Sequence, residues 1–164
     1  MKLSSHEEYG LRCLLQVARR GEHGSATIPE ISRSEGISLP YAAKLLRMLR
    51  RGGFVKAARG KAGGYTLALP PEQIFVGDAL AILGGRIYED GFCGKHAGTK
   101  RDCVHSAECS MRSLWRTLQD AVDRVLGSTT LRDLLCRNDS AVMPDELERA
   151  LTILNARPAG RPGL

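Results

Sequence analysis

Three cysteines, Cys93, Cys103 and Cys109, lie in a segment rich in glycine and lysine, with nine residues between the first two and five between the last two. Thiolates are preferred ligands of soft metals, and the intervening glycines allow the backbone to fold back so that the sulfurs converge on one metal centre. The fourth ligand must come from elsewhere. A zinc site is one possibility, because three thiolates and a histidine such as His105 satisfy tetrahedral zinc.

The chain has five cysteines, an odd number that argues against a set of disulfides. A reduced thiol away from a metal behaves as a small hydrophobic side chain. Cys13, among apolar neighbours, and Cys136, beside two leucines, are therefore expected in the core.

The composition is that of a globular protein with a real core: 164 residues, 43% of them hydrophobic. No run of eighteen apolar residues is present, and the first eight residues lack the apolar stretch of a signal peptide, so a cytoplasmic protein with no membrane contact is expected. The sequence contains no phosphate-binding glycine loop, hydrolase nucleophile motif or metalloprotease helix, which argues against an enzyme.

The net charge of +6 is concentrated in the first part of the chain. Residues 1–69 carry 12 Lys and Arg against 5 Asp and Glu, a balance of +7, whereas residues 70–164 carry 12 against 13, a balance of −1. A concentrated basic face favours polyanion binding through counterion release. The first part of the chain is therefore the candidate nucleic-acid reader.

Capping residues and apolar spacing predict three helices before residue 52. The first begins at Ser4 or Ser5, the second at the Thr27 capping box, and the third at Ser38, with Gly36 in the intervening turn. Their expected ranges are residues 4–20, 27–34 and 38–51. This spacing is typical of a helix-turn-helix.

Two short strands, residues 54–57 and 65–69, follow and are joined by a basic, glycine-rich turn. A hairpin directly after a helix-turn-helix predicts a wing. A short helix is expected at residues 74–83. The predicted fold class is mainly α with a small β-wing, a winged helix-turn-helix followed by a long dimerisation helix.

The third helix of a winged helix enters the major groove, so its inner face must be apolar and its outer face polar. Leu45, Leu46 and Leu49 are expected to face inward. The candidate DNA-binding residues are those left on the outer face together with two at the wing tip: Ser38, Tyr41, Lys44, Arg47, Arg59 and Lys61. Taken alone, such a charge run is often only a solvated helix face.

A long helix is predicted at residues 110–126, where apolar residues recur at helical spacing: Met111, Leu114, Trp115, Leu118, Val122 and Val125. An exposed stripe of this kind requires a partner. Four units are predicted: a winged-helix domain at 1–84, a cysteine-rich loop at 85–109, the dimerisation helix with a short following helix at 110–138, and a partly disordered extension at 139–164.

Several segments together resemble the Rrf-type winged-helix regulators, the family that includes IscR, NsrR and RirA. They are the start Met1-Lys2-Leu3-Ser4, the turn from Gly36 to Tyr41, the wing from Arg59 to Tyr65, and the three cysteines before a long helix. The likeness covers residues 1–138. It implies a homodimer on a pseudo-palindromic double-stranded DNA operator, with an iron-sulfur cluster, [4Fe-4S] or [2Fe-2S], on Cys93, Cys103 and Cys109.

The same resemblance suggests a fourth cluster ligand. In IscR-like members it is a histidine three residues after the last cysteine, but that position is Arg112 here, which cannot ligate. In NsrR-like members it is a carboxylate from the first helix of the partner, and Glu8 holds that position. His105 and His96 are rival ligands, and Glu8 could instead cap the first helix together with Ser5.

The function implied is a dimeric transcriptional regulator whose operator affinity is controlled by an iron-sulfur cluster that senses iron, nitric oxide or redox state. The alternative is a zinc-stabilised winged-helix protein without a sensing role. Cluster nuclearity, the physiological signal, the operator sequence and the choice between repressor and activator stay open.

Overall fold

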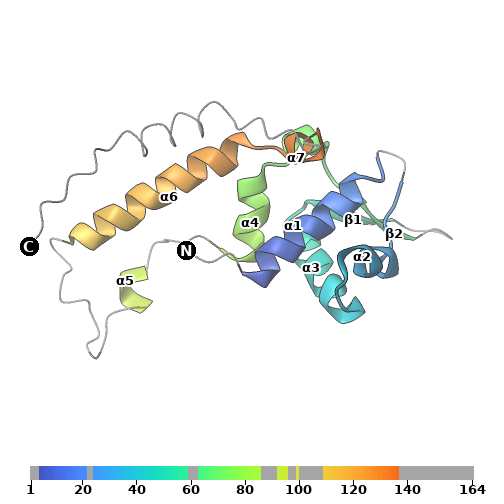
Figure 1. Ribbon diagram of the computed structural model, residues 1–164, viewed down its shortest axis with the longest axis horizontal. Helices are drawn as coiled ribbons and strands as arrows, with labels where there is room; N and C mark the ends of the chain where they lie inside the picture. The colour runs from blue at the N-terminus through green and yellow to red at the C-terminus, as the bar shows by residue number, and fades with distance from the viewer. Residues whose placement is uncertain are drawn as a thin grey trace, which may run out of the picture.

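The computed structural model describes residues 4–21, 24–58, 63–85, 92–95, 99 and 109–136. Helices dominate, and the two strands form one antiparallel sheet, which confirms the predicted fold class (Figure 1). In chain order the elements are α1 (Ser5–Ala18), α2 (Ile28–Glu35), α3 (Leu39–Arg51), β1 (Val55–Ala58), β2 (Gly64–Leu67), the 3-10 turn η1 (Pro71–Gln73), α4 (Val76–Leu83), α5 (Phe92–Lys95), α6 (Ser110–Ser128) and α7 (Leu131–Cys136).

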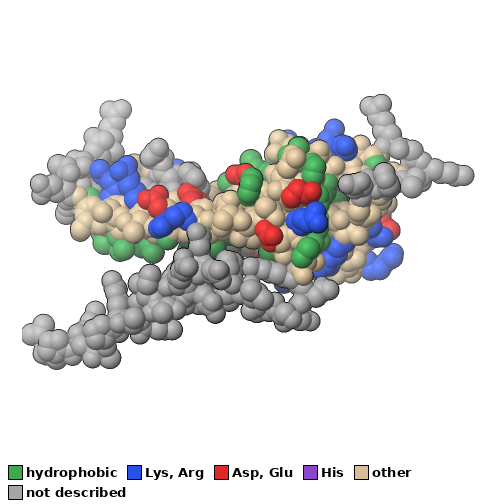
Figure 2. Space-filling view, turned by 90° about the horizontal axis from the view of Figure 1, so that it is seen from above, with side chains coloured by type: hydrophobic (Ala, Val, Ile, Leu, Met, Phe, Trp, Pro, Cys, Tyr) green, Lys and Arg blue, Asp and Glu red, His purple; other side chains and the backbone are tan. Residues whose placement is uncertain are grey.

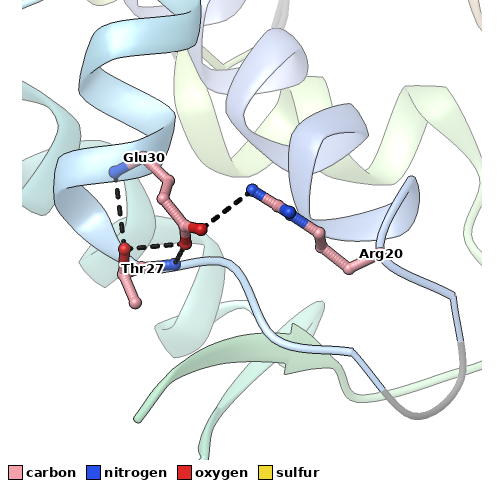
Figure 3. A network of polar contacts seen from close by, with 3 residues as sticks. All are labelled: Arg20, Thr27 and Glu30. Atoms are coloured by element: carbon pink, nitrogen blue, oxygen red, sulfur yellow. Dashed lines mark hydrogen bonds and ion pairs between the residues drawn. The ribbon is translucent and has the colours of Figure 1, made fainter. Parts of the chain in front are cut away.

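The first two helices begin with capping boxes, as their sequences predict. Ser4 caps α1: its hydroxyl accepts from the Glu7 N–H, and Oε2 of Glu7 accepts from the Ser4 N–H at 2.7 Å. Thr27 and Glu30 repeat the arrangement at α2, where Arg20 adds an ion pair to Glu30 at 3.2 Å (Figure 3). Each box satisfies N–H groups that would otherwise lack a partner at the start of a helix.

A tight turn connects α2 to α3. Gly36 adopts φ +64°, a left-handed conformation that glycine takes without steric cost. Ser38 then caps α3 by accepting from the Tyr41 N–H. The helix-turn-helix predicted from Gly36 and Ser38 is therefore present.

The core lies where α1, α2 and α3 meet. Leu45, Leu46 and Leu49 of α3 are fully buried, which confirms that this face points inward. Leu14 of α1 and Ile31 of α2 are also in this core. Burial of such side chains contributes about 1.5–3 kcal/mol each, so the core fixes the orientation of α3 and hence of its outer face.

The wing is a two-stranded hairpin in which Val55 pairs with Leu67 and Ala58 with Gly64. An isolated bridge between Ala26 and Tyr65 attaches it to the start of α2. The strands begin and end within one or two residues of the predicted bounds. The wing tip, with Arg59 and Lys61, lies outside the described residues.

Most helix boundaries differ from the prediction by one or two residues; α1, for example, ends at Ala18 and not at residue 20. The helix expected from Ile74 begins at Val76, because Ile74 and Phe75 are extended: the Ile74 carbonyl accepts from the Leu131 N–H at 2.8 Å, and Phe75 bridges Thr130. The long helix continues two residues beyond the expected end, through Gly127 to Ser128. The short helix α5 also lies within the segment predicted as a loop.

Much of α6 projects away from the winged helix, and α4 lies between the two (Figure 1). Its apolar residues Met111, Leu114 and Leu118 are between 43% and 50% exposed. Figure 2 shows apolar side chains gathered along one edge of this helix. Trp115, Val122 and Val125 are half-buried, so within the described part of one chain the predicted stripe stays partly uncovered. None of the described helices is both long and apolar enough to cross a lipid bilayer.

Candidate nucleic-acid interface and metal-ligand residues

The outer face of α3 is basic. Lys44, Arg47, Arg50 and Arg51 are all exposed, and α3 contains no acidic residue. The three arginines also line an open hollow on the surface. Guanidinium groups so arranged can each donate two hydrogen bonds to a phosphate or to the edge of a guanine.

Ser38 lies at the leading end of this face and is exposed. Its hydroxyl oxygen accepts the capping hydrogen bond from the Tyr41 N–H at 3.4 Å. The hydroxyl proton remains free to donate, because a serine hydroxyl accepts through its oxygen lone pairs and donates through its O–H. Ser38 can therefore cap α3 and still donate to an acceptor on DNA.

Tyr41 packs against α1 from its place on α3. Its hydroxyl oxygen is buried without a hydrogen-bond partner in the described part of the chain. Its ring meets the rings of His6 and Tyr9 edge to face, at centroid distances of 5.5 Å and 6.2 Å. Packing against α1 buries the Tyr41 hydroxyl and joins α1 to α3, while the residue as a whole stays half-buried. The predicted contact of Tyr41 with DNA stays a prediction.

Lys44 also contacts α1. Its ammonium nitrogen lies 2.8 Å from Nε2 of His6. His6 was not predicted as a functional residue, since no local signal links residues 38 positions apart. His6, Tyr41 and Lys44 together form a junction between the first helix and the outer face of α3, called the α1–α3 junction below.

Two of the three candidate thiolate ligands are described. Cys93 lies in α5 and Cys109 is the N-cap residue of α6; both are half-buried, and neither is in a disulfide. Cys103, His96 and His105 lie outside the described residues. Within the described ranges of one chain, no group of three His, Cys, Asp or Glu side chains could hold a metal ion.

Glu8, the candidate fourth ligand, is on α1 with its side chain 47% exposed. It does not cap the helix, because Glu7 makes the capping box with Ser4. Glu8 instead pairs with Arg12, and both contacts, 2.7 Å from Nε and 2.6 Å from Nη2, use Oε1. The hydrogen bond to Glu8 and its charge raise the pKa of Arg12. Among the described residues no contact uses Oε2 of Glu8, so the carboxylate can bind a metal while it remains paired with Arg12.

The other two cysteines differ in their surroundings. Cys13 is fully buried in the core, as predicted, and burial raises the pKa of its thiol to about 12, with a smaller contribution from Glu35. Cys136 is exposed, so the prediction of a core residue is wrong. The helix α7 buries Leu131 and leaves Cys136, its last residue, at the surface.

Comparisons with known proteins agree with this architecture. Residues 3–137 match the Rrf2 family profile, described as an iron-dependent transcriptional regulator. Protein rrf2 of Nitratidesulfovibrio vulgaris is 34% identical over 88% of this chain and 92% of its own length. The transcriptional regulator CymR of Bacillus subtilis is 33% identical over 85% of this chain and 93% of its own length.

Solved structures give the same result. The structure of CymR, titled the global cysteine regulator of B. subtilis, has a TM-score of 0.68 at 32% identity and covers 85% of this chain and 99% of its own. The structure of T. potens IscR has a TM-score of 0.68 at 30% identity and covers 88% of this chain and 93% of its own.

Proposed function

The chain belongs to the Rrf2 family of transcriptional regulators, which are not enzymes. On that premise we propose that an iron-sulfur cluster controls the affinity of the protein for DNA. The proposed protein is a cytoplasmic homodimer on a pseudo-palindromic operator. The proposed ligands are Cys93, Cys103 and Cys109, with Glu8 of the partner subunit's first helix as the fourth. The proposed DNA contacts are Ser38, Tyr41, Lys44 and Arg47 on α3, with Arg59 and Lys61 on the wing.

The observation that carries the DNA-binding part is the outer face of α3. Four exposed cations and no acid stand on a capped helix whose opposite face is fixed in the core. A diffusely basic surface would not give this one-sided arrangement. Each cation that neutralises a phosphate releases counterions, so binding should weaken steeply with salt.

The donor set suits a cluster. Cys93 and Cys109 are free thiols that bracket the segment containing Cys103. Glu8 has an exposed carboxylate whose Oε2 makes no contact with the described part of the chain. When bound, an iron-sulfur cluster supplies a group that can be lost, oxidised or nitrosylated, and a carboxylate ligand is more labile than a thiolate.

The α1–α3 junction provides the route from ligand to DNA. Glu8 lies on the same helix as His6 and Tyr9, and those two side chains contact Tyr41 of α3. A change in the position of α1 therefore acts on α3, the helix proposed to contact DNA, through direct side-chain contacts. A coupling of about 1–3 kcal/mol, usual for allosteric proteins, changes affinity about 5- to 150-fold.

The test is to purify the full chain anaerobically, record its absorption spectrum, and measure iron and sulfide. A DNA duplex that the protein selects from a randomised library is then titrated with cluster-loaded and cluster-free protein at one salt concentration. We expect visible absorption, bound iron and sulfide, and a difference in affinity. Colourless protein containing zinc would support the zinc-stabilised alternative, because d¹⁰ zinc does not absorb in the visible. Equal affinities would rule out control by the cluster.

The fourth ligand is tested with a matched pair of variants. Glu8→Ala removes both the carboxylate and its ion pair, whereas Arg12→Ala removes the same ion pair and keeps the carboxylate. We expect Glu8→Ala to lose iron faster to a chelator and Arg12→Ala to behave as the wild type. If His105→Ala loses iron and Glu8→Ala does not, the histidine is the ligand.

A further inference from the structure

The leading end of α3 presents apolar atoms where a reading helix meets the bases. Leu39, the first residue of the helix, is 50% exposed. Pro40, the next residue, is exposed and has no N–H to donate. Neither residue belongs to the hydrophobic core, so both apolar side chains lie at the surface where a partner can contact them.

The neighbours of Leu39 on the helix indicate the chemistry of the surface that can contact it. Residues four apart share one face of a helix, so Leu39 is followed on its face by the half-buried Ala43 and then by the exposed Arg47. Arg50 stands beside the same row. The start of α3 is therefore apolar and is followed by basic side chains, and the helix contains no Asp or Glu. Such a face is complementary to a surface that is apolar at one point and anionic around it.

The major groove of DNA is such a surface. The C5 methyl group of thymine is its one apolar feature, and phosphates line both edges of the groove. The N-terminal residues of a recognition helix are those that reach base edges. We infer that Leu39, assisted by Pro40 and Ala43, is a specificity-determining residue that selects operators by contact with thymine methyl groups. This inference rests on the proposed DNA-binding function.

The start of α3 offers few hydrogen-bonding groups that could read a base in place of the proposed contact between Leu39 and a thymine methyl group. Leu39, Pro40 and Ala43 have side chains without donors or acceptors, so the first turn offers only the Ser38 hydroxyl for polar readout. The nearest charged side chain in the same helix is Lys44, one turn further along. The preference at this end of the site is therefore for a methyl group, not for a hydrogen-bonding pattern.

The test begins with selection of duplexes from a randomised library by the full wild-type chain, purified anaerobically. Each thymine of the selected duplex is then replaced by deoxyuridine, which removes the methyl group and leaves base pairing intact. We expect a loss of affinity of about threefold to fivefold at one or more thymines in each half-site, as burial of a single methyl group accounts for.

Leu39→Ala should abolish that penalty at the same thymines. Leu69→Ala is the control, because Leu69 is also exposed, at 43%, but lies outside α3; it should retain the full penalty. If wild-type protein shows no penalty at any thymine, or Leu39→Ala keeps it, the inference is overturned while DNA binding stands. If no duplex is enriched or bound, the proposed function itself fails.

Discussion

The ammonium nitrogen of Lys44, on the outer face of α3, lies 2.8 Å from Nε2 of His6 on α1. An ammonium group has three donors, so one hydrogen bond to the imidazole leaves two for a phosphate. The contact holds a long, flexible side chain in place at the surface. His6 is thereby a positioning residue for Lys44.

The first prediction concerns this contact. His6→Ala should weaken DNA binding about twofold to tenfold, because an ordered lysine side chain becomes mobile and must be ordered again on binding. The slope of log affinity against log salt should not change, since Lys44 still reaches its phosphate. Lys44→Ala should instead lower the magnitude of that slope by about 0.9. The measurement is a fluorescence-anisotropy titration at several salt concentrations, with iron content matched.

His6→Gln serves as the control, because its amide oxygen can accept from the ammonium group. It should bind more tightly than His6→Ala. A His6→Ala protein with unchanged affinity, or with the same loss of salt slope as Lys44→Ala, would contradict the positioning role.

The second prediction concerns the exposed stripe of α6. Leu118→Glu should weaken dimerisation about 100-fold or more, because a carboxylate left unpaired in an apolar interface costs about 3–5 kcal/mol. Sedimentation equilibrium gives the dissociation constant. Ser113→Glu is the control: it adds the same charge at an exposed position about 140° around the same helix. If both variants stay dimeric, the stripe is not the dimer interface.

Local rules explain which features could be predicted from the sequence. The caps at Ser4, Thr27 and Ser38 and the turn at Gly36 each depend on residues within four positions, and all were confirmed. The inward face of α3 followed from helical periodicity. The motifs that indicated the family are spread over residues 1–138. The family profile matches nearly the same stretch, residues 3–137.

Features that depend on packing between distant elements could not be predicted in the same way. Helical periodicity placed Tyr41 on the outer face, but its packing against His6 and Tyr9 and the burial of its hydroxyl depend on α1. Ile74 had helical spacing, but a bridge to the segment before α7 keeps it extended. Cys136 has apolar neighbours in sequence but stands at the exposed end of α7. The ligand set stays a prediction, because Cys103 lies outside the described residues.

The third prediction concerns the cap of α2. Thr27→Ala should lower the free energy of unfolding by about 1 kcal/mol, because the Glu30 N–H loses its acceptor and Glu30 loses the Thr27 hydroxyl. Thr27→Ser retains the hydroxyl and should lose much less. Urea unfolding followed by circular dichroism measures both. Equal losses would show that the methyl group, not the cap, stabilises the helix start.

The fourth prediction is the pH dependence of the same cap. The Thr27 N–H, then the Thr27 hydroxyl, lower the pKa of Glu30, with help from Arg20 and Arg33. A lowered pKa in the folded state means that the carboxylate stabilises the fold above the unfolded pKa of about 4.3 and loses this effect as pH falls through the folded value. Glu30→Gln should therefore cost more stability at pH 7 than at pH 3 in urea unfolding; a cost independent of pH would contradict this.

The fifth prediction compares the two cysteines outside the proposed ligand set. Cys13 is fully buried, and burial raises the pKa of its thiol to about 12, so at pH 8 the thiol stays protonated and little of the reactive thiolate is present. Cys136 is exposed at the end of α7. Iodoacetamide at pH 8 should therefore modify Cys136 in the folded protein and leave Cys13 intact, as peptide mass spectrometry would show. Prior unfolding in guanidinium chloride should make both react, because it removes the burial that keeps Cys13 protonated. Rapid labelling of Cys13 without denaturant would show that α1 is not packed on α3 as described.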